Sequence, residues 1–259
     1  AQRVAQRMYL RTGAAELWFN LAFDDILPDV PGELPVPASP PDRADRLTIG
    51  WVSTPPAPGS GGHTTLFRMV EALESRGHRC VVYLYDKHGL DVDRATHTIR
   101  RHWPHIQAEV RDITAGVRGV DAIVASGWES AHLIVRYGTE PVRRLYFIQD
   151  YEPFFYGHGA EHELAAMTYP MPFCRIALRQ MLDRMIREET GLSSDVVPLG
   201  CDSAVYRPPA PAKRRSGIVF FSRPDFARRG YQIAVVALRL FLERHPEQQI
   251  HVYGAPPRG

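Results

Sequence analysis

An eight-residue stretch near the middle of the chain, residues 149–156 (QDYEPFFY), combines two acids with four aromatic residues. Asp150 and Glu152 are the candidate acids, since a carboxyl group can act as a general base or hold a sugar hydroxyl. The aromatic rings, among them Tyr151 and Tyr156, can shape a cleft for a carbohydrate. The alternative is an acidic turn whose aromatic side chains fold into the core.

Glycines gather in a second stretch, residues 58–64 (PGSGGHT), directly after an expected strand. Gly61 and Gly62 would let backbone N–H groups approach an anion at the start of the next helix. The spacing matches neither the dinucleotide fingerprint G-x-G-x-x-G nor a Walker A loop, because no Gly-Lys-Ser/Thr is present. A plain flexible turn with a threonine cap is the alternative.

Three arginines and one tryptophan complete the candidates for ligand binding. Arg223, Arg228 and Arg229 flank an expected strand-to-helix junction, where guanidinium groups suit a diphosphate through paired hydrogen bonds. Trp128 follows another expected strand, where its ring could stack on a sugar. A solvated basic loop and a half-buried core tryptophan are the respective alternatives.

Metal and thiol chemistry find little support in the spacing of histidines and cysteines. His158 and His162 would lie one helical turn apart, but no Glu follows the first histidine, so H-E-x-x-H is absent. We expect a surface pair and no metal site. The three cysteines, at positions 80, 174 and 201, form no C-x-x-C, and we expect free thiols in a reducing cytoplasm.

The composition is that of an ordinary globular protein, with 44% hydrophobic and 23% charged residues over 259 positions. The 31 basic and 29 acidic residues leave a net charge of +2, which creates no overall field for nucleic acid. The chain has no run of about 18 apolar residues and no signal-peptide core at its start. We therefore expect a cytoplasmic protein without nucleic-acid partners.

Strand and helix patterns alternate along most of the chain, which predicts an α/β fold: a Rossmann-like parallel sheet flanked by helices. Short apolar runs predict strands at 47–52, 80–85, 106–110, 121–126, 144–149, 195–199, 217–222 and 249–253. Residues 173–177 form an apolar stretch that leads into a helix. Amphipathic spacing predicts helices at 63–76, 129–137, 161–168, a further one ending near 189, and 231–245. Ligands of such sheets bind at the carboxyl ends of strands, where the strand order reverses.

The predicted domains follow from the same pattern. Residues 1–45 comprise an amphipathic helical segment over 1–27 and a proline-rich extended strap over 28–41. Residues 46–205 form the Rossmann-like domain of the acceptor side, and residues 206–259 form a linker and the start of a second domain. One strand–helix–strand unit cannot form its own core, so we expect the chain to be part of a longer protein.

Several of these stretches, in this order, resemble the retaining GT-B glycosyltransferases of family 4. Residues 60–62 (SGG), then a helix and residues 76–82 (RGHRCVV), are similar to the start of those chains. Residues 197–208 resemble their interdomain P-x-G-V-D…F-x-P segment, and residues 221–230 resemble their G-R…K-G donor signature. Residues 146–153 (YFIQDYEP) look most similar to WsaF-like rhamnosyltransferases of S-layer and surface polysaccharides.

This resemblance implies a two-domain, metal-independent enzyme that transfers a deoxyhexose, L-rhamnose, from dTDP-L-rhamnose. The acceptor would be a polysaccharide or a lipid-linked glycan, reached at the inner face of the cell membrane. Asp150 and Glu152 would be catalytic. The donor-binding residues would be Gly61, Gly62, Arg223, Arg228 and Arg229, and the acceptor-binding residues would be His63, Trp128, Tyr151 and Tyr156. No cofactor is implied besides the nucleotide sugar.

The chain departs from that family at two points. The second basic position of the donor signature is usually lysine and is Arg229 here, which can still pair with phosphate. The family's E-x7-E segment would lie beyond Gly259, so we expect this chain alone to lack full activity. Two alternatives stay open: a carbohydrate- or nucleotide-binding module without catalysis, and a Rossmann oxidoreductase, which the absent G-x-G-x-x-G disfavours and which NAD(H) binding would reveal.

Overall fold

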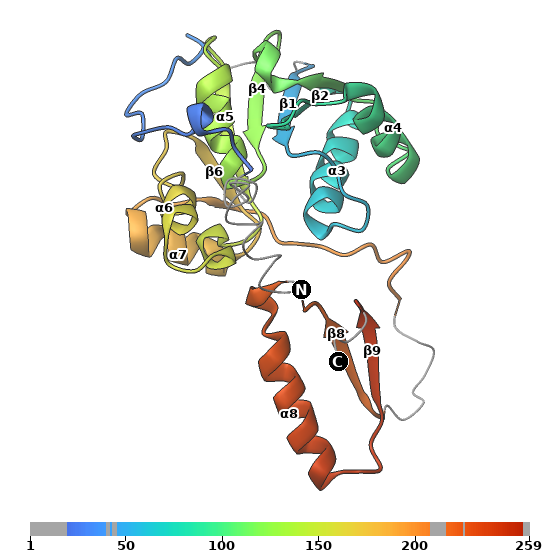
Figure 1. The fold of residues 1–259 in the computed structure, drawn as a ribbon. Helices are drawn as coiled ribbons and strands as arrows, with labels where there is room; N and C mark the ends of the chain where they lie inside the picture. Colours follow the sequence, from blue (N-terminus) through green and yellow to red (C-terminus); the bar gives the residue numbers. More distant parts are fainter. Residues whose placement is uncertain (1–19, 40–41, 43–45, 208–215, 225, 256–259) are drawn as a thin grey trace. The chain divides into compact units, whose positions relative to one another are not determined.

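The computed structural model describes residues 20–39, 42, 46–207, 216–224 and 226–255. The chain divides into two compact units, Ala1–Leu199 and Gly200–Gly259, which we call the larger and the smaller unit (Figure 1). The smaller unit begins at Gly200, and the domain boundary after residue 205 stays a prediction.

The larger unit is built on a parallel sheet of seven strands in the order β3-β2-β1-β4-β5-β6-β7 (Figure 1). The chain runs outward from β1 to β3 and then returns to the other side of β1, so the strand order reverses between β1 and β4. This confirms the predicted α/β class and the Rossmann-like sheet. The strands are β1 (Thr48–Ser53), β2 (Arg79–Leu84), β3 (Glu109–Asp112), β4 (Ala122–Ala125), β5 (Arg143–Ile148), β6 (Cys174–Ala177) and β7 (Asp195–Val196).

Helices cover both faces of this sheet, which is why its central strands are apolar throughout. Successive residues of β2 alternate between two buried clusters, with Val81 and Tyr83 on one face and Val82 and Leu84 on the other. The second face packs against α3 (Gly61–Glu74) and α4 (Val92–His102). The first face packs against α5 (Trp128–Tyr137), α6 (Ala160–Ala166) and α7 (Gln180–Thr190).

Apart from shifts of one or two residues at other element ends, the structure differs from the prediction at α4, β3, β6 and β7. Strand β6 has only an apolar stretch leading into a helix as its predicted counterpart. Helix α4 has no predicted counterpart, because only Ala95 and Ile99 mark its buried face. Strand β3 begins at Glu109 rather than at residue 106, since Val81 of β2 pairs first with Glu109. Strand β7 ends at Val196 instead of 199. The end of α7 is as predicted, with Gly191 in the left-handed conformation at φ 74°.

Residues 20–39, which include most of the predicted proline-rich segment, are called the N-terminal strap below. The strap lies against the rest of the larger unit. Its Asp25 carboxylate is buried and accepts hydrogen bonds from the hydroxyls of Tyr85 (2.7 Å) and Tyr137 (2.6 Å). Arg144 donates to the carbonyl of Pro35 at 2.5 Å. Within the predicted helix over 1–27, residues 1–19 lie outside the described part, and residues 20–27 hold only a 3-10 turn, η1 (Phe23–Asp25).

Replacing Asp25 by alanine should lower the free energy of unfolding by about 2–3 kcal/mol, because two buried tyrosine hydroxyls lose their acceptor. Tryptophan fluorescence during urea denaturation measures this in the larger unit, since all four tryptophans lie in residues 1–199. Asp24→Ala is the matched control, because Asp24 is exposed. Equal stabilities of the two variants would contradict an anchoring role for Asp25.

In its described residues, the smaller unit contains one strand–helix–strand motif. Strands β8 (Ile218–Ser222) and β9 (Ile250–Gly254) pair in parallel, and η4 (Ala227–Arg229) and α8 (Tyr231–Arg244) connect them. Gly254 has φ 101°, and a Cβ there would stand 2.5 Å from the carbonyl oxygen of Ser222, so only glycine fits. None of the side chains of α8 is buried, and Ile233, Val236 and Leu240 are exposed.

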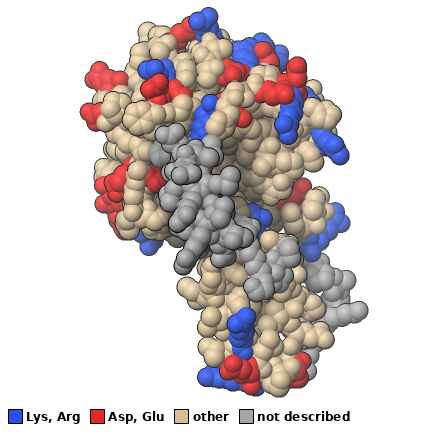
Figure 2. Space-filling model, viewed as in Figure 1, with Lys and Arg blue, Asp and Glu red and all other residues tan. Residues whose placement is uncertain are grey.

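The surface carries charges of both signs. On the face of the larger unit drawn in Figure 2, basic and acidic side chains are interspersed, so this face offers no uniformly basic surface. Among the described residues, none of the helices is long and apolar enough to cross a membrane.

Candidate functional site

Three loops meet at the carboxyl ends of β1, β4 and β5, beside the point where the strand order reverses. The Ser126 hydroxyl, after β4, donates to the carbonyl of Val52 in β1 (2.6 Å). A Cβ on Gly62, after β1, would lie 3.9 Å from the side-chain amide of Gln149, which follows β5. We call residues 60–63, 126–129 and 149–156 the switch-point site, because ligands of open α/β sheets bind at this position.

The loop after β1 contributes an open helix N-terminus. Ser60 caps α3 by accepting a hydrogen bond from the amide of His63 at 3.4 Å. Gly61 and Gly62 are exposed, and neither has a positive φ. A Cβ on Gly61 would meet nothing within 4 Å, so the fold itself does not require glycine there. The first amides of a helix carry partial positive charge and suit an anion.

The His63 ring is half-buried beside this helix start. Its Nε2 lies 3.4 Å from the carbonyl oxygen of Thr54, and its ring stacks on Phe67. Burial lowers the pKa of His63, which keeps the imidazole neutral at physiological pH. Nδ1 is buried and has no hydrogen-bond partner among the described residues. His63 therefore lies at the edge of the site with one ring nitrogen enclosed and unpaired among the described residues.

Asp150 is the acid of the site that solvent reaches. It lies two positions after the last residue of β5 and is exposed. Its Oδ1 accepts a hydrogen bond from the amide of Tyr151 at 3.0 Å. This hydrogen bond stabilises the start of the loop. The role of Asp150 as an acid within reach of a sugar hydroxyl stays a prediction.

Glu152, the second predicted acid, lies below the loop instead of on its surface. Its buried carboxyl group accepts hydrogen bonds from the backbone amide of Trp128 (2.6 Å) and the hydroxyl of Tyr146 (2.9 Å). Burial, and then the nearby charge of Glu129, raises the pKa of Glu152 to about 8. Glu152 is thus neutral at pH 7, and in this structure it joins the loop to α5 rather than facing a substrate.

Glu129 is a residue of the site that the sequence argument missed. A Cβ on Gly127 would stand 3.3 Å from Glu152 Oε1 and 3.4 Å from Glu129 Oε2, so the two carboxyl groups flank the same glycine. Burial raises the pKa of Glu129, and Asn20 of the N-terminal strap donates to its Oε1 at 2.8 Å. In the sequence, Glu129 could have been found as the acid that directly follows Gly-Trp, in the first helical turn after a predicted strand.

The aromatic side chains of the site divide between core and surface. Trp128 is 2% exposed and Tyr151 3%, so neither presents a ring face on which a sugar could stack. Trp128 Nε1 donates to the hydroxyl of Tyr156 (3.0 Å), and the Tyr151 hydroxyl donates to Glu189 of α7. Of the proposed acceptor-binding aromatics, only Tyr156 is partly exposed. Trp128 and Tyr151 are therefore core side chains, which is the alternative that the sequence left open.

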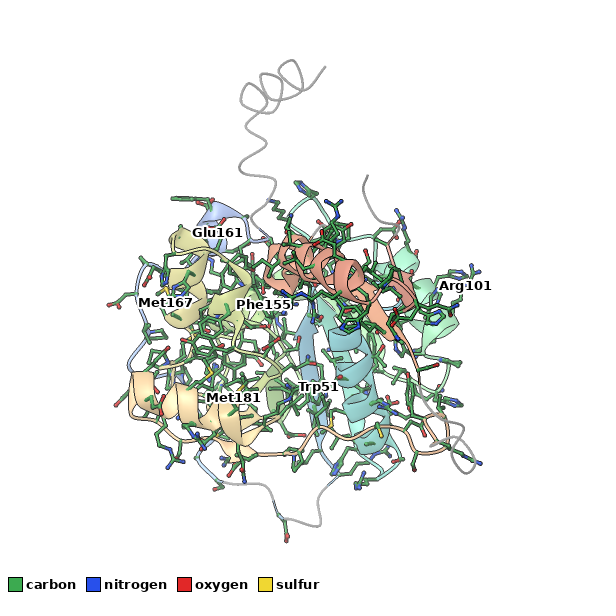
Figure 3. The ribbon with its side chains drawn as sticks, turned by 90° about the horizontal axis from the view of Figure 1, so that it is seen from below. Trp51, Arg101, Phe155, Glu161, Met167 and Met181 are labelled. Carbon is green, nitrogen blue, oxygen red and sulfur yellow. The ribbon has the colours of Figure 1, made fainter. Side chains whose placement is uncertain are left out.

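The rest of this segment is more open. Phe154 is 62% exposed and lies in η3 (Glu152–Phe155) with Phe155. Figure 3 shows Phe155 and Met167 on the half of the larger unit that contains α6 and α7, with Arg101 of α4 on the other half. Phe154 therefore adds an exposed aromatic ring four residues after Asp150 in the chain.

The three predicted donor-binding arginines all lie in the smaller unit, at the carboxyl end of β8. Arg223 stacks its guanidinium over the rings of Phe221 (5.4 Å) and Phe226 (4.8 Å). Arg228 and Arg229 are exposed on η4, between β8 and α8. That these arginines and the glycines of α3 bind one diphosphate stays a prediction.

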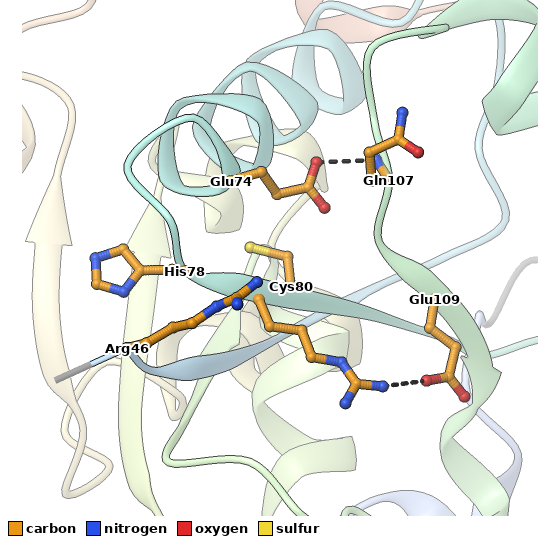
Figure 4. A pocket seen from close by; sticks show the side chains of 7 residues that line it. Arg46, Glu74, His78, Cys80, Gln107 and Glu109 are labelled. Atoms are coloured by element: carbon orange, nitrogen blue, oxygen red, sulfur yellow. Dashed lines mark hydrogen bonds and ion pairs between the residues drawn. The ribbon is translucent and has the colours of Figure 1, made fainter.

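A separate depression of about 330 Å³ lies at the opposite, amino end of the sheet (Figure 4). Glu109 in its wall is paired with Arg79 (3.1 Å) and Arg111 (2.8 Å), and Glu74 accepts from the amide of Gln107. Burial raises the pKa of the Cys80 thiol to about 12, so this thiol is unreactive. The two carboxylates of the depression are thus already engaged in ion pairs and hydrogen bonds.

The two histidines predicted to form a surface pair do lie side by side. The ring centroids of His158 and His162 are 4.5 Å apart. His162 Nδ1 is 3.3 Å from Oε1 of Glu163. Among the described residues, these three form one group whose metal-ligand atoms lie within 4.8 Å of one another.

The comparisons with known proteins give one related sequence. No protein-family model matches the chain. The chain is similar to the O-antigen biosynthesis protein RfbC of Myxococcus xanthus, with 26% identity over 202 residues. These cover 75% of this chain but only 16% of that protein's length. Membership of glycosyltransferase family 4, and of its WsaF-like group, stays a prediction.

Proposed function

We propose that this protein is a glycosyltransferase of polysaccharide biosynthesis that transfers L-rhamnose from dTDP-L-rhamnose to a growing glycan. The order of the motifs from Gly61 to Arg229 supports this proposal. The similarity to a protein named for O-antigen biosynthesis supports the polysaccharide product. The reaction would take place in the cytoplasm, at the inner face of the membrane if the acceptor is lipid-linked.

One observation carries the proposal: an open helix N-terminus and an exposed carboxylate stand on the two sides of the strand-order reversal. The amides of Gly61 and Gly62 suit a diphosphate, and Asp150 suits a hydroxyl group. Gln149, next to Asp150, is the residue whose side chain approaches Gly62. A nucleotide sugar and its acceptor need these two kinds of group close together.

The proposed reaction can be written with these groups. Asp150 takes the proton of the acceptor hydroxyl, whose oxygen forms a bond to the anomeric carbon of the sugar. The bond from that carbon to the diphosphate breaks, and its electron pair leaves with dTDP. The amides of Gly61 and Gly62 take up negative charge on the leaving group, and Arg223, Arg228 and Arg229 stay predicted donor-binding residues, so the proposed transfer uses no metal ion. His63 and Tyr156 line the acceptor side.

Replacing Gly62 by alanine tests the donor site without harming the fold. Because alanine favours helix over glycine by up to about 1 kcal/mol, the variant should be as stable as the wild type or more stable. A Cβ at this position would nevertheless stand where the diphosphate must approach the amides. We expect about a tenfold loss of affinity for dTDP-L-rhamnose, measured by calorimetry on the full-length protein.

Gly32→Ala in the N-terminal strap is the control, since a Cβ there meets nothing within 4 Å. Wild-type donor affinity in Gly62→Ala would rule out the proposed diphosphate site. Donor binding without any turnover, across several glycan acceptors, would favour a binding module without catalysis.

A further inference from the structure

We propose that His158, His162 and Glu163 form a binding site for a divalent transition-metal ion such as Zn²⁺. The observation behind it is the juxtaposition of two imidazole rings and a carboxylate at the start of α6. This inference is independent of the transferase proposal, in which no step uses a metal ion.

The three donors come from one short stretch but from two kinds of structure. His158 precedes α6, between Gly157 and Gly159, and His162 lies in its first turn. The ring centroids are 4.5 Å apart, so the two imidazole rings are in contact. Glu163 joins them through Oε1, which is 3.3 Å from His162 Nδ1. The start of α6 therefore places the Glu163 carboxylate beside the two histidines, which the sequence spacing predicts only as a surface pair.

The distances suit a metal ion after small side-chain rotations. All three ligand atoms lie within 4.8 Å of one another. Ligand atoms about 2.0–2.2 Å from a tetrahedral zinc ion stand about 3.5 Å apart. His158 and Glu163 are exposed, so their side chains can turn inward without disturbing the core. The ion would replace the hydrogen bond between His162 and Glu163 with one coordinate bond to each residue.

The chemistry of the donors selects the class of ion. Two imidazole nitrogens and one carboxylate oxygen suit Zn²⁺, Co²⁺, Ni²⁺ and Cu²⁺, whereas Mg²⁺ and Ca²⁺ prefer oxygen ligands alone. Glu161 lies on the same helix and adds negative charge near the site. Three protein ligands leave at least one coordination position for water or a ligand oxygen.

An ion here would tie His158 to α6 and so restrain the glycine-flanked connection. Helix α6 has seven residues, which is too short to be stable without tertiary support. It packs against η3, which carries Phe154 and Phe155. Metal binding would therefore also stabilise the segment that follows Asp150.

The test is calorimetric titration of the full chain with ZnCl₂, together with the thermal midpoint of unfolding with and without the metal. We expect one Zn²⁺ per chain and a higher midpoint in its presence. His158→Asn and His162→Asn should each lower the affinity about tenfold or more, and Glu163→Gln should lower it less. The control is His97→Asn, which removes an exposed imidazole of α4 and should change nothing.

Every outcome decides the proposal. All four variants change only residues that are exposed or half-buried, and circular dichroism checks that each is folded. The proposal is overturned by an absence of saturable binding at submillimolar Zn²⁺. It is also overturned if His158→Asn and His162→Asn bind as the wild type does, because the ion would then use other ligands.

Discussion

Replacing Asp150 by asparagine in the full-length protein should lower kcat for transfer from dTDP-L-rhamnose by about 10²–10⁴-fold. The amide oxygen of asparagine can still accept the hydrogen bond from the Tyr151 amide, so the loop keeps its conformation. What the variant loses is the ability to take a proton from the acceptor. Because Asp150 is exposed, the free energy of unfolding should change by less than about 0.5 kcal/mol.

The matched control is Asp86→Asn. Asp86 also lies beyond the carboxyl end of a strand of the same sheet, β2, and its Oδ1 accepts a local amide hydrogen bond from His88 at 2.9 Å. It is outside the switch-point site, so its turnover should equal that of the wild type. Initial rates over a range of donor and acceptor concentrations separate kcat from KM. Full turnover in Asp150→Asn would remove this carboxylate from the proposed mechanism.

Glu152→Gln should remove a large part of the pH dependence of stability. The folded-state pKa of Glu152 is raised from 4.5 to about 8, so the folded protein holds a proton that the unfolded chain releases between these values. The stabilisation is fully present below about pH 4.5 and is lost as the pH rises toward 8. We expect the wild type to lose about 2 kcal/mol more than the variant between about pH 6 and pH 8.5.

Glutamine suits this test because its carbonyl can still accept from the Trp128 amide and the Tyr146 hydroxyl. Urea denaturation at each pH, followed by tryptophan fluorescence, gives the free energies. Taking the difference between wild type and variant at the same pH cancels the opposite contribution of buried, neutral His63 and His132, whose pKa values burial lowers. Parallel stability curves for the two proteins would mean that Glu152 is ionised in the folded state.

The carboxyl groups of the switch-point site lie at different depths: Glu152 is buried, Glu129 is half-buried and Asp150 is exposed. Asp150 meets solvent, whereas Glu152 connects the loop after β5 to the first turn of α5 through the Trp128 amide. Glu129 lies beside Glu152 and also reaches the N-terminal strap through Asn20. Glu152 therefore holds the loop after β5 against the first turn of α5, and a direct catalytic role for Glu152 stays a prediction.

Local patterns in the sequence determined the fold class, and they predicted that a ligand site lies at the carboxyl end of the sheet. Apolar runs alternating with amphipathic helices required a parallel sheet, since the strand pairs are joined by crossover helices. The glycines at 61 and 62 and the acid at 150 each follow a strand, and the carboxyl ends of parallel strands share one edge. Their proximity was therefore predictable before any coordinates, while α4 was not, because only two buried residues mark it.

The tertiary structure alone decided how deeply each side chain lies and which loops touch. From the sequence alone, the stretches that contain Trp128, Tyr151 and Glu152 could lie on the surface or in the core. These three side chains are buried because β4 and β5 are neighbours, so that the loop after one covers the loop after the other. The meeting of Glu129 with Glu152 has the same origin. Contacts between residues so far apart in the chain depend on strand order, which no local periodicity encodes.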